Sequence, residues 1–339
     1  MNYCAVDLHG NNGFYGIIDE DGKRVFNRRI SNDLPSVLEA LKPYREQLRE
    51  TGIVVESTFN WYWLVDGLMD NGYTVHLANP AAVHQYDGLK CADDKTDAFF
   101  LAELARLNIL PEAHIYPKEE RPVRDMLRRR LLLVRQRTQH KLSLGSLFSR
   151  ETGGKLSSNA ICKLKPADAG KLFDSECNRM MAGINLEAIK FLNGQIKSIE
   201  KVVIEKAELR KAFEILLTVP GIGRILALTI MLETGSVDRF TKAGNYTSYC
   251  RCVKSKKTSN GKKKGENNGK NGNAYLCWAY IEAANFMKRY CPEAKAWHQR
   301  KAKRTNNIVA TKALASKLSK ACYFMMKNQE EFDVKLLFR

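Results

Sequence analysis

The alternation of apolar and polar positions changes along the chain and divides it into three parts. In residues 1–117, short apolar runs bounded by turn residues alternate with stretches of helical spacing, a pattern that predicts strands interleaved with helices. The expected strands are 3–8, 13–19, 24–30, 52–57 and 73–80, and the expected helices are 34–49, 60–72 and 95–110. Their order, β-β-β-α-β-α-β-α, predicts a mixed α/β domain.

Strand signals are absent from the second part, residues 118–213. Residues 121–150 follow a helical pattern and carry nine Arg or Lys against one acidic residue, so we expect a basic helix that lies against a nucleic-acid backbone. Further along, apolar residues recur with the 3-4-3-4 spacing of a coiled-coil seam: Ile189, Leu192, Ile196, Ile199 and Val203. Such a seam needs a partner helix, and we interpret it as an oligomer contact.

The third part, residues 214–339, is predicted to be mostly helical. It opens with the turn "PGIG" before an apolar helix, and further helices are expected at 273–290 and 308–327. Between them, residues 251–270 carry eight Lys or Arg and one acid among Gly, Asn, Ser and Thr. This composition is typical of a loop, which we expect to be poorly ordered until phosphates neutralise its charge.

The net charge of +18 and a pI of about 9.5 indicate a polyanionic partner. No apolar run approaches the roughly 20 residues that span a bilayer, and the first residues lack a secretory signal pattern. Nucleic acid is therefore the expected partner rather than a membrane. The nine cysteines are scattered without a C-x-x-C pair, which argues against a disulfide framework or zinc finger and favours reduced thiols in a cytoplasmic protein.

Four carboxylates are candidates for a metal site. Asp7 and Glu56 lie in otherwise apolar predicted strands, where a charge is costly unless a partner or metal compensates it. Asp94 and Asp97 are three residues apart at a helix start and share one face. Hard oxygen ligands suit one or two Mg²⁺ ions, and two metals can clamp a phosphodiester. Alternatively, the acids at the helix start only complement its dipole.

Three groups of residues are candidates for nucleic-acid binding. Gly221 and Gly223 of "VPGIG" allow a turn whose N–H groups grip a phosphate, although a plain tight turn has the same sequence. The expected phosphate contacts of the basic helix are Arg128, Arg129, Arg130, Arg135 and Arg137. Those of the lysine-rich loop are Lys256, Lys257, Lys262, Lys263 and Lys264.

The same loop contains a candidate nucleophile, Ser259. Neighbouring cations favour a serine alkoxide and stabilise negative charge on a reacting phosphate. Residue type alone leaves other hydroxyls equally plausible: Tyr246, Ser248, Tyr249 and Ser255.

The order of these parts resembles the DEDD-type transposases of insertion sequences related to the Piv DNA invertases, which are RNA-guided bridge recombinases. The resemblance rests on the segments "AVDLHGNN", "VVESTFNWYWLVDGLMDNGYTVHLANPAAVHQY", "DDKTDAFFLAELA" and "LLTVPGIGRILALTIMLETGSVDRF" and on the pattern Y-x-x-x-x-x-S-x-x-x-S-x-G before G-N-x-x-L. It places Asp7, Glu56, Asp94 and Asp97 at the acidic positions of the family and Ser259 at its nucleophilic serine. This chain has Arg251 and Lys254 where the family usually has Gly and Pro, and Asn260 where a Gly usually follows the serine, so Ser255 is the alternative register.

The resemblance implies an RNase H-like, RuvC-like N-terminal domain (1–117), a helical coiled-coil region (118–213) and a mostly helical transposase domain with a serine loop (214–339). It also implies donor and target DNA, a structured non-coding guide RNA, and a homo-oligomer, dimer or tetramer, in the bacterial cytoplasm. Strand exchange passes through a 5′-phosphoserine, with the acids of one subunit completed by the serine of another. Two other classes remain: an endonuclease like a Holliday-junction resolvase, and a nucleic-acid binder with structural acids.

Overall fold

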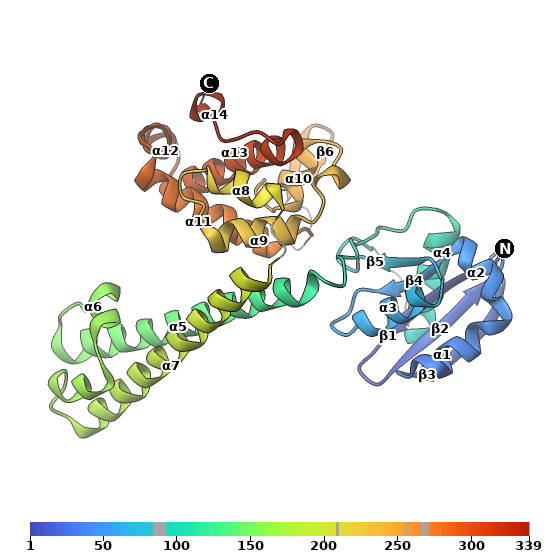
Figure 1. The fold of residues 1–339 in the computed structure, drawn as a ribbon, viewed down its shortest axis with the longest axis horizontal. Coiled ribbons are helices and arrows are strands. Elements are labelled where there is room, and N and C mark those ends of the chain that lie inside the picture. Colours follow the sequence, from blue (N-terminus) through green and yellow to red (C-terminus); the bar gives the residue numbers. More distant parts are fainter. Residues whose placement is uncertain are drawn as a thin grey trace. The chain divides into compact units, whose positions relative to one another are not determined.

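The computed structural model describes residues 1–83, 93–207, 210–253, 255, 257–265, 269 and 271–338, without the side chains of Lys257 and Lys263. The chain divides into two compact units, Met1–Lys118 and Glu119–Arg339, and each is described by itself (Figure 1). The finer division of the second unit near residue 213 stays a prediction.

The first unit is a sheet with helices on both faces. Its strands are β1 (Tyr3–Leu8), β2 (Asn12–Ile18), β3 (Arg24–Ser31), β4 (Ile53–Glu56) and β5 (Val75–Ala78). Its helices are α1 (Leu34–Leu41), the 3-10 turn η1 (Lys42–Tyr44), α2 (Arg45–Thr51), α3 (Tyr62–Asp70) and α4 (Asp94–Arg106). The order expected from the sequence is confirmed, except that the helix expected over 34–49 is broken. Pro43 lies at the break, where its ring and missing N–H interrupt the helical hydrogen bonds.

The five strands lie in the order β3-β2-β1-β4-β5. β1 pairs antiparallel with β2 and parallel with β4, which in turn pairs parallel with β5. Alternate side chains of β1 lie on opposite faces: Val6 packs in the core with α1, α2 and α3, and Ala5 packs in the core with α4. This mixed sheet is compatible with an RNase H-like domain.

The regular elements among the described residues of the second unit are helices and one hairpin. It begins with α5 (Arg121–Thr152), α6 (Ser158–Lys163), η2 (Pro166–Lys171) and α7 (Glu176–Lys206). The elements that follow are α8 (Lys211–Leu217), α9 (Arg224–Thr234), η3 (Val237–Arg239), α10 (Ala243–Tyr249), strands β6 (Lys257–Ser259) and β7 (Lys262–Gly265), α11 (Ala274–Tyr290), α12 (Pro292–Arg304), α13 (Asn307–Asn328) and α14 (Val334–Phe338). The sequence analysis did not foresee α12, which begins at a proline in its first turn.

Helices α5 and α7 lie side by side as an antiparallel pair, with α6 near the end at which the chain reverses (Figure 1). The predicted seam of α7 is buried, and its Leu192 and Ile196 form a cluster with Leu133 of α5. The interpretation of the seam as an oligomer contact is therefore wrong, because its partner helix belongs to the same chain. The spacing of apolar residues shows that a partner is needed but does not say which helix supplies it.

The C-terminal helices share one large core with the base of this helix pair. Val123 of α5 and Val203 of α7 are buried in the same cluster as residues of α8, α9, α11 and α13. This common core explains why residues 119–339 form one compact unit.

The polycationic segment expected to be a loop contains a two-stranded antiparallel hairpin. Ser259 pairs with Lys262, and the turn between them is Asn260–Gly261. Both turn residues have positive φ, 50° and 71°, as the tight hairpin turn that favours Asn-Gly requires. An Asn-Gly pair is a strong sequence signal for a hairpin. The loop was instead predicted from the overall composition of residues 251–270.

The described helices include none that is long and apolar enough to cross a membrane. The cysteines of the described parts are all free thiols.

Candidate functional site

The fold of the first unit places Asp7 and Glu56 side by side. Asp7 follows Val6 on β1, Glu56 follows Val55 on the adjacent parallel strand β4, and Val6 pairs with Val55. Because side chains alternate along a strand, both carboxylates lie on the face that α4 covers, with Ala5 and Val54. Asp7 is only 5% exposed, and its carboxyl forms a hydrogen bond with Glu56.

The start of α4 brings two more acids to this face. Asp93 is the N-cap, and its side chain accepts a hydrogen bond from the N–H of Thr96 at 2.7 Å. Asp94 and Asp97 follow in the first turn. Asp93 thus has the capping role, while Asp94 and Asp97 both interact electrostatically with Asp7.

His9 lies between two of these carboxylates. Its Nε2 is 3.2 Å from an oxygen of Asp7 and 3.2 Å from an oxygen of Asp94. The Nε2 atom makes no hydrogen bond of acceptable geometry to a described residue. Ligand atoms of Asp7, His9 and Asp94 lie within 4.8 Å of one another. The main-chain carbonyl of His9 accepts hydrogen bonds from the side-chain amides of Asn32 at 3.0 Å and Asn60 at 2.8 Å, which fix its position.

Arg29 of β3 compensates part of this negative charge. Its guanidinium donates to Asp94 at 2.6 Å and to the side-chain oxygen of Asn12 at 3.0 Å. The hydrogen bond from Arg29 holds the pKa of Asp94 below its ordinary value.

Burial disfavours the ionised forms of both paired carboxyls. Burial raises the pKa of Glu56 to about 7, and the hydrogen bond to Asp7 and the charges of Asp7 and Asp97 add to the rise. Burial also raises the pKa of Asp7. A low-dielectric site that holds several carboxylates keeps a proton because their negative charges repel one another.

This arrangement fits a divalent cation. The donors are mostly hard carboxylate oxygens, two of which lie on adjacent strands, and a cation would offset the mutual repulsion of their charges. The imidazole of His9 adds a nitrogen donor that transition metals accept more readily than Mg²⁺.

The sequence analysis missed His9 and Arg29. His9 follows Asp7 by two residues, the spacing that keeps side chains on one face of a strand. Arg29 pairs across the sheet with Phe14, which pairs with Asp7, so the three occupy one row. The first signal is readable from sequence spacing, whereas the second needs the strand register.

Ser259 lies at the end of β6, exposed, immediately before the Asn260–Gly261 turn. Lys262 and Lys264 of β7 are exposed on the same hairpin. The predicted phosphate contacts of Lys256, Lys257 and Lys263 concern side chains that lie outside the described part of the structure.

The two ends of the serine segment are joined at their base. The N–H of Asn273 donates to the carbonyl of Tyr249 at 2.6 Å, and Arg251 Nε donates to the carbonyls of Asn271 at 3.1 Å and Gly272 at 3.0 Å. Arg251 and Asn260 both have positive φ, 52° and 50°. The family resemblance puts a glycine at both of these positions. Both residues adopt the positive-φ backbone conformation that glycine prefers.

The other candidate nucleophiles differ in access. Tyr246 is fully buried, and its hydroxyl is hydrogen-bonded to Thr234 at 2.9 Å and Tyr280 at 2.7 Å. Burial raises the pKa of Tyr246 well above its ordinary value, so it does not suit attack on DNA. Ser248 is exposed, whereas Tyr249 and Ser255 are half-buried.

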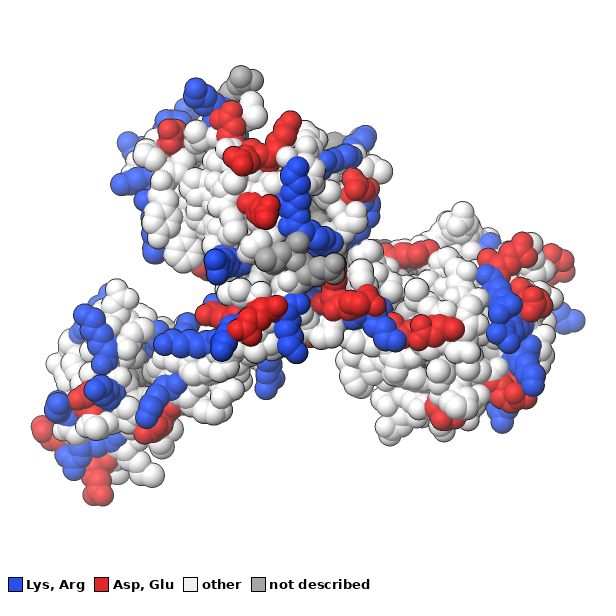
Figure 2. Space-filling model, in the orientation of Figure 1, with Lys and Arg blue, Asp and Glu red and all other residues white. Residues whose placement is uncertain are grey.

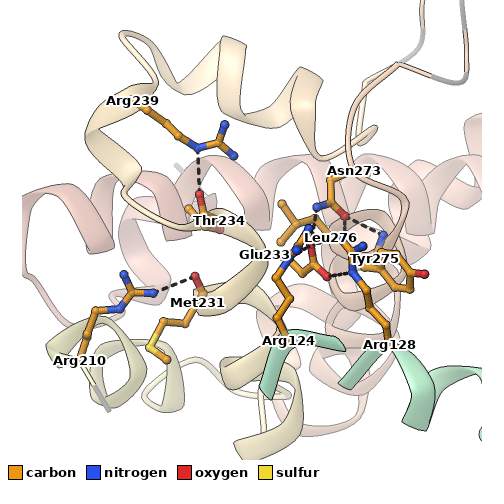
Figure 3. Close-up of polar contacts among 10 residues, drawn as sticks. All are labelled: Arg124, Arg128, Arg210, Met231, Glu233, Thr234, Arg239, Asn273, Tyr275 and Leu276. Atoms are coloured by element: carbon orange, nitrogen blue, oxygen red, sulfur yellow. Dashed lines mark hydrogen bonds and ion pairs between the residues drawn. The ribbon is translucent and has the colours of Figure 1, made fainter. Parts of the chain in front are cut away.

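A buried ion cluster fixes the helix that follows the serine segment (Figure 3). Glu233 of α9 accepts hydrogen bonds from Arg124 and Arg128 of α5 and, at 2.7 Å, from the amide of Asn273. The Asn273 side chain also caps α11 by accepting from the N–H groups of Tyr275 and Leu276. Although burial alone raises it, the pKa of Glu233 is lowered by the hydrogen bond from Arg128 and by both arginine charges.

Several arginines of the predicted basic helix bind residues of the same chain. Arg128 binds Glu233, Arg130 binds Glu200 of α7 at 2.6 Å, and Arg137 donates to Asn193 of α7 at 2.7 Å. Arg129 and Arg135 are exposed. Three of the five predicted phosphate-binding arginines thus hold helices together, and on the face shown in Figure 2 basic and acidic side chains are interspersed. Their contact with nucleic acid stays a prediction.

The two glycines of "VPGIG" have different surroundings. Gly221 has φ 99°, and a Cβ there would lie 2.5 Å from the main-chain nitrogen of Met287. With Pro220 before it and a hydrogen bond from the N–H of Ile222 to the carbonyl of Val219, it forms a tight turn against α11. Gly223 is the N-cap of α9, and a Cβ there would meet no described atom within 4 Å. Packing therefore explains Gly221, whereas Gly223 leaves the start of α9 open.

A mixed sheet with clustered carboxylates and a separate helical unit are the features of a DEDD-type enzyme acting on nucleic acid. Comparison with known families agrees. Residues 4–150 match the DEDD transposase domain of the IS110 family, and residues 213–299 match a domain described as Transposase IS116/IS110/IS902 family. The two matches support the IS110/IS116 family and, in general terms, a DNA transposase or recombinase that cuts and rejoins DNA. No curated protein matches the chain.

Proposed function

We propose that the protein exchanges DNA strands through a phosphoserine formed on Ser259, with one or two Mg²⁺ ions held by Asp7, Glu56, Asp94 and Asp97. The observation that carries the proposal is that one transposase chain combines clustered carboxylates on adjacent strands with an exposed serine on a lysine-bearing hairpin.

The proposed step needs no reactant other than the serine hydroxyl and the DNA phosphodiester. Ser259 Oγ forms a bond to phosphorus while the bond from phosphorus to the 3′ oxygen breaks. The serine proton passes to the departing 3′ oxygen, which leaves a 5′-phosphoserine and a free 3′ hydroxyl. Attack by a different 3′ hydroxyl then rejoins the strands and restores the serine.

The residues of the chain have separate tasks in this step. Lys262 and Lys264 neutralise the DNA backbone beside Ser259, and their charge favours loss of its proton. The Asn260–Gly261 turn holds the serine at the tip of a short hairpin rather than on a free coil. Asp7 and Glu56, fixed by paired strands, would hold a divalent ion, which would supply polarisation of the phosphate and stabilisation of charge on the departing oxygen.

We propose donor DNA, target DNA and a structured guide RNA as the partners. A net charge of +18 suits simultaneous contact with donor DNA, target DNA and a structured guide RNA that pairs with both. We propose that the serine segment of one subunit completes the acidic site of another in a homo-oligomer. The α7 seam is not the oligomer contact, because α5 occupies it.

The test is to trap the covalent adduct on a nicked DNA substrate and to map the modified peptide by mass spectrometry. We expect a metal-dependent adduct on Ser259 that is lost in Ser259→Ala and in Asp97→Asn. Ser255→Ala and Ser248→Ala are matched controls that keep it. An adduct that survives Ser259→Ala would refute the assignment, and metal-dependent hydrolysis without any adduct would favour a resolvase-like endonuclease.

A further inference from the structure

A cavity of about 840 Å³ opens in the second unit between α5, the turn from α8 to α9, and α11. Neither the carboxylate cluster nor the serine segment contributes to its walls. A volume of this size falls in the range of roughly 300–1,000 Å³ that is typical of pockets for small ligands.

One wall is a row of side chains from α11. Trp278, Glu282, Phe286 and Tyr290 recur every four residues, so they share one helix face and all line the cavity. Trp278 and Phe286 are half-buried against the core, while Tyr290 is 67% exposed. Aromatic rings held in this way offer flat faces on which a nucleobase can stack.

Positive charge also lines the cavity. Arg224 is the first residue of α9 and is exposed, and Gly223 before it has no side chain that caps the first N–H groups of the helix. Open N–H groups and the helix dipole at such an end attract a phosphate. Arg137 lines the same cavity, and its Nε is buried without a hydrogen-bond partner among the described residues.

Glu282 adds selectivity to this wall. An ionised carboxylate accepts hydrogen bonds but donates none, and it repels a phosphate. Glu282 in this cavity therefore suits a ligand group that presents two adjacent hydrogen-bond donors. Among the bases, guanine presents two neighbouring donors, N1–H and the 2-amino group, to one carboxylate.

We propose that this cavity binds one unpaired nucleotide of a single strand, guanine in preference to the other bases. The base stacks on Trp278 with its donors at Glu282, one turn further along α11, and its phosphate lies at the start of α9 near Arg224. A base inside a duplex has both faces covered, so only an unpaired nucleotide presents a free face. The inference rests on the proposed function only in taking nucleic acid as the partner.

The experiment measures binding of labelled single-stranded hexamers to the full chain by fluorescence anisotropy, without metal and without cleavage. Each hexamer carries one central guanine, inosine or adenine in a thymine or uracil background. We expect the guanine hexamer to bind most tightly, and inosine, which lacks the 2-amino group, to bind more weakly. DNA and RNA hexamers are compared, and the tighter sugar identifies the strand that supplies the nucleotide.

Three variants test the cavity, and two of them have matched controls outside it. Trp278→Leu should weaken binding about tenfold or more, as expected for loss of one stacked base, whereas Trp297→Leu on α12 should not. Arg224→Ala should lower affinity and salt dependence more than Arg300→Ala. Glu282→Gln, which keeps the shape of the side chain, should remove the preference for guanine over inosine. Thermal melting of each variant checks folding.

Equal binding of guanine and inosine by the wild-type protein, or equal losses in Trp278→Leu and Trp297→Leu, would overturn the inference. Such a result together with a normal adduct on Ser259 would reject the cavity alone. Guanine-selective binding without any adduct would instead reject the phosphoserine proposal and leave the cavity in place.

Discussion

Replacing Glu233 with alanine tests whether the buried ion cluster holds the second unit together. The Glu233 side chain is 2% exposed and the Arg124 side chain 7% exposed, while Arg128 is 29% exposed. Glu233 accepts from Arg124 Nε at 3.1 Å, from Arg128 Nη2 at 2.8 Å and from Asn273 Nδ2 at 2.7 Å.

The expected loss of unfolding free energy follows from the buried charge of Arg124 that remains. Without Glu233, Arg124 is left buried without its counter-ion, and breaking a buried pair in this way costs about 3–5 kcal/mol. Asn273 also loses a partner that orients it as the α11 cap, and a cap is worth about 1 kcal/mol. Arg128→Ala should cost less, about 1–3 kcal/mol, because Glu233 keeps Arg124.

The assay is urea unfolding of the full chain, followed by circular dichroism and by hydrogen exchange. The transition of Glu119–Arg339 should move to lower urea in Glu233→Ala, while the transition of Met1–Lys118 stays in place. Glu205→Ala is the control, because its exposed pair with Lys201 is worth at most about 0.5 kcal/mol. A free energy of unfolding for Glu233→Ala within about 1 kcal/mol of the wild type would refute the reasoning.

The same cluster has a defined pH dependence. The folded protein lowers the pKa of Glu233 from its ordinary 4.5, so its ionised form contributes stability above that pH. This contribution should fall away as the pH drops through the lowered folded value. The stability difference between the wild type and Glu233→Gln should therefore shrink in acid, and a constant difference would contradict the lowered pKa.

Three other predictions concern packing and metal binding. Ile196→Ala should cost about 2–5 kcal/mol of unfolding free energy without changing the oligomer mass in ultracentrifugation, because its partner helix is in the same chain. Gly221→Ala should destabilise the second unit by more than about 2 kcal/mol in urea unfolding, whereas Gly223→Ala should cost only about 0.5–1 kcal/mol as a cap change. Mg²⁺ or Mn²⁺ at about 100 times its Kd should stabilise the first unit by roughly 2.7 kcal/mol in calorimetry, and Asp7→Asn should abolish that shift. Equal effects in the glycine pair, or a metal shift that survives Asp7→Asn, would contradict these assignments.

Much of the carboxylate cluster is readable from the sequence. An acid inside an apolar strand, as at Asp7 and Glu56, is costly unless it is compensated, so its presence already predicts a site. Strand alternation and the three-residue spacing of Asp94 and Asp97 then predict which faces meet. Local pattern carries this information because the period of strands and helices is a property of the backbone.

Other features depended on contacts between distant segments. The seam that includes Ile196 showed that α7 needs a partner, but only the folded chain identified α5, since apolar surfaces are not specific for one partner. Arg128 looked like a phosphate ligand by composition, yet Glu233, more than one hundred residues away, binds it. Arg29 reached the acids only through the register of two strand pairings.

The sequence by itself determined the order of elements in the first unit, the acid positions and the Asn-Gly turn after Ser259, because these depend on neighbouring residues. Only the tertiary structure decided which arginines are paired internally, which glycine is required by packing, and where a cavity opens. Those outcomes depend on long-range packing and on compensation of buried charge, and no local pattern encodes either of them.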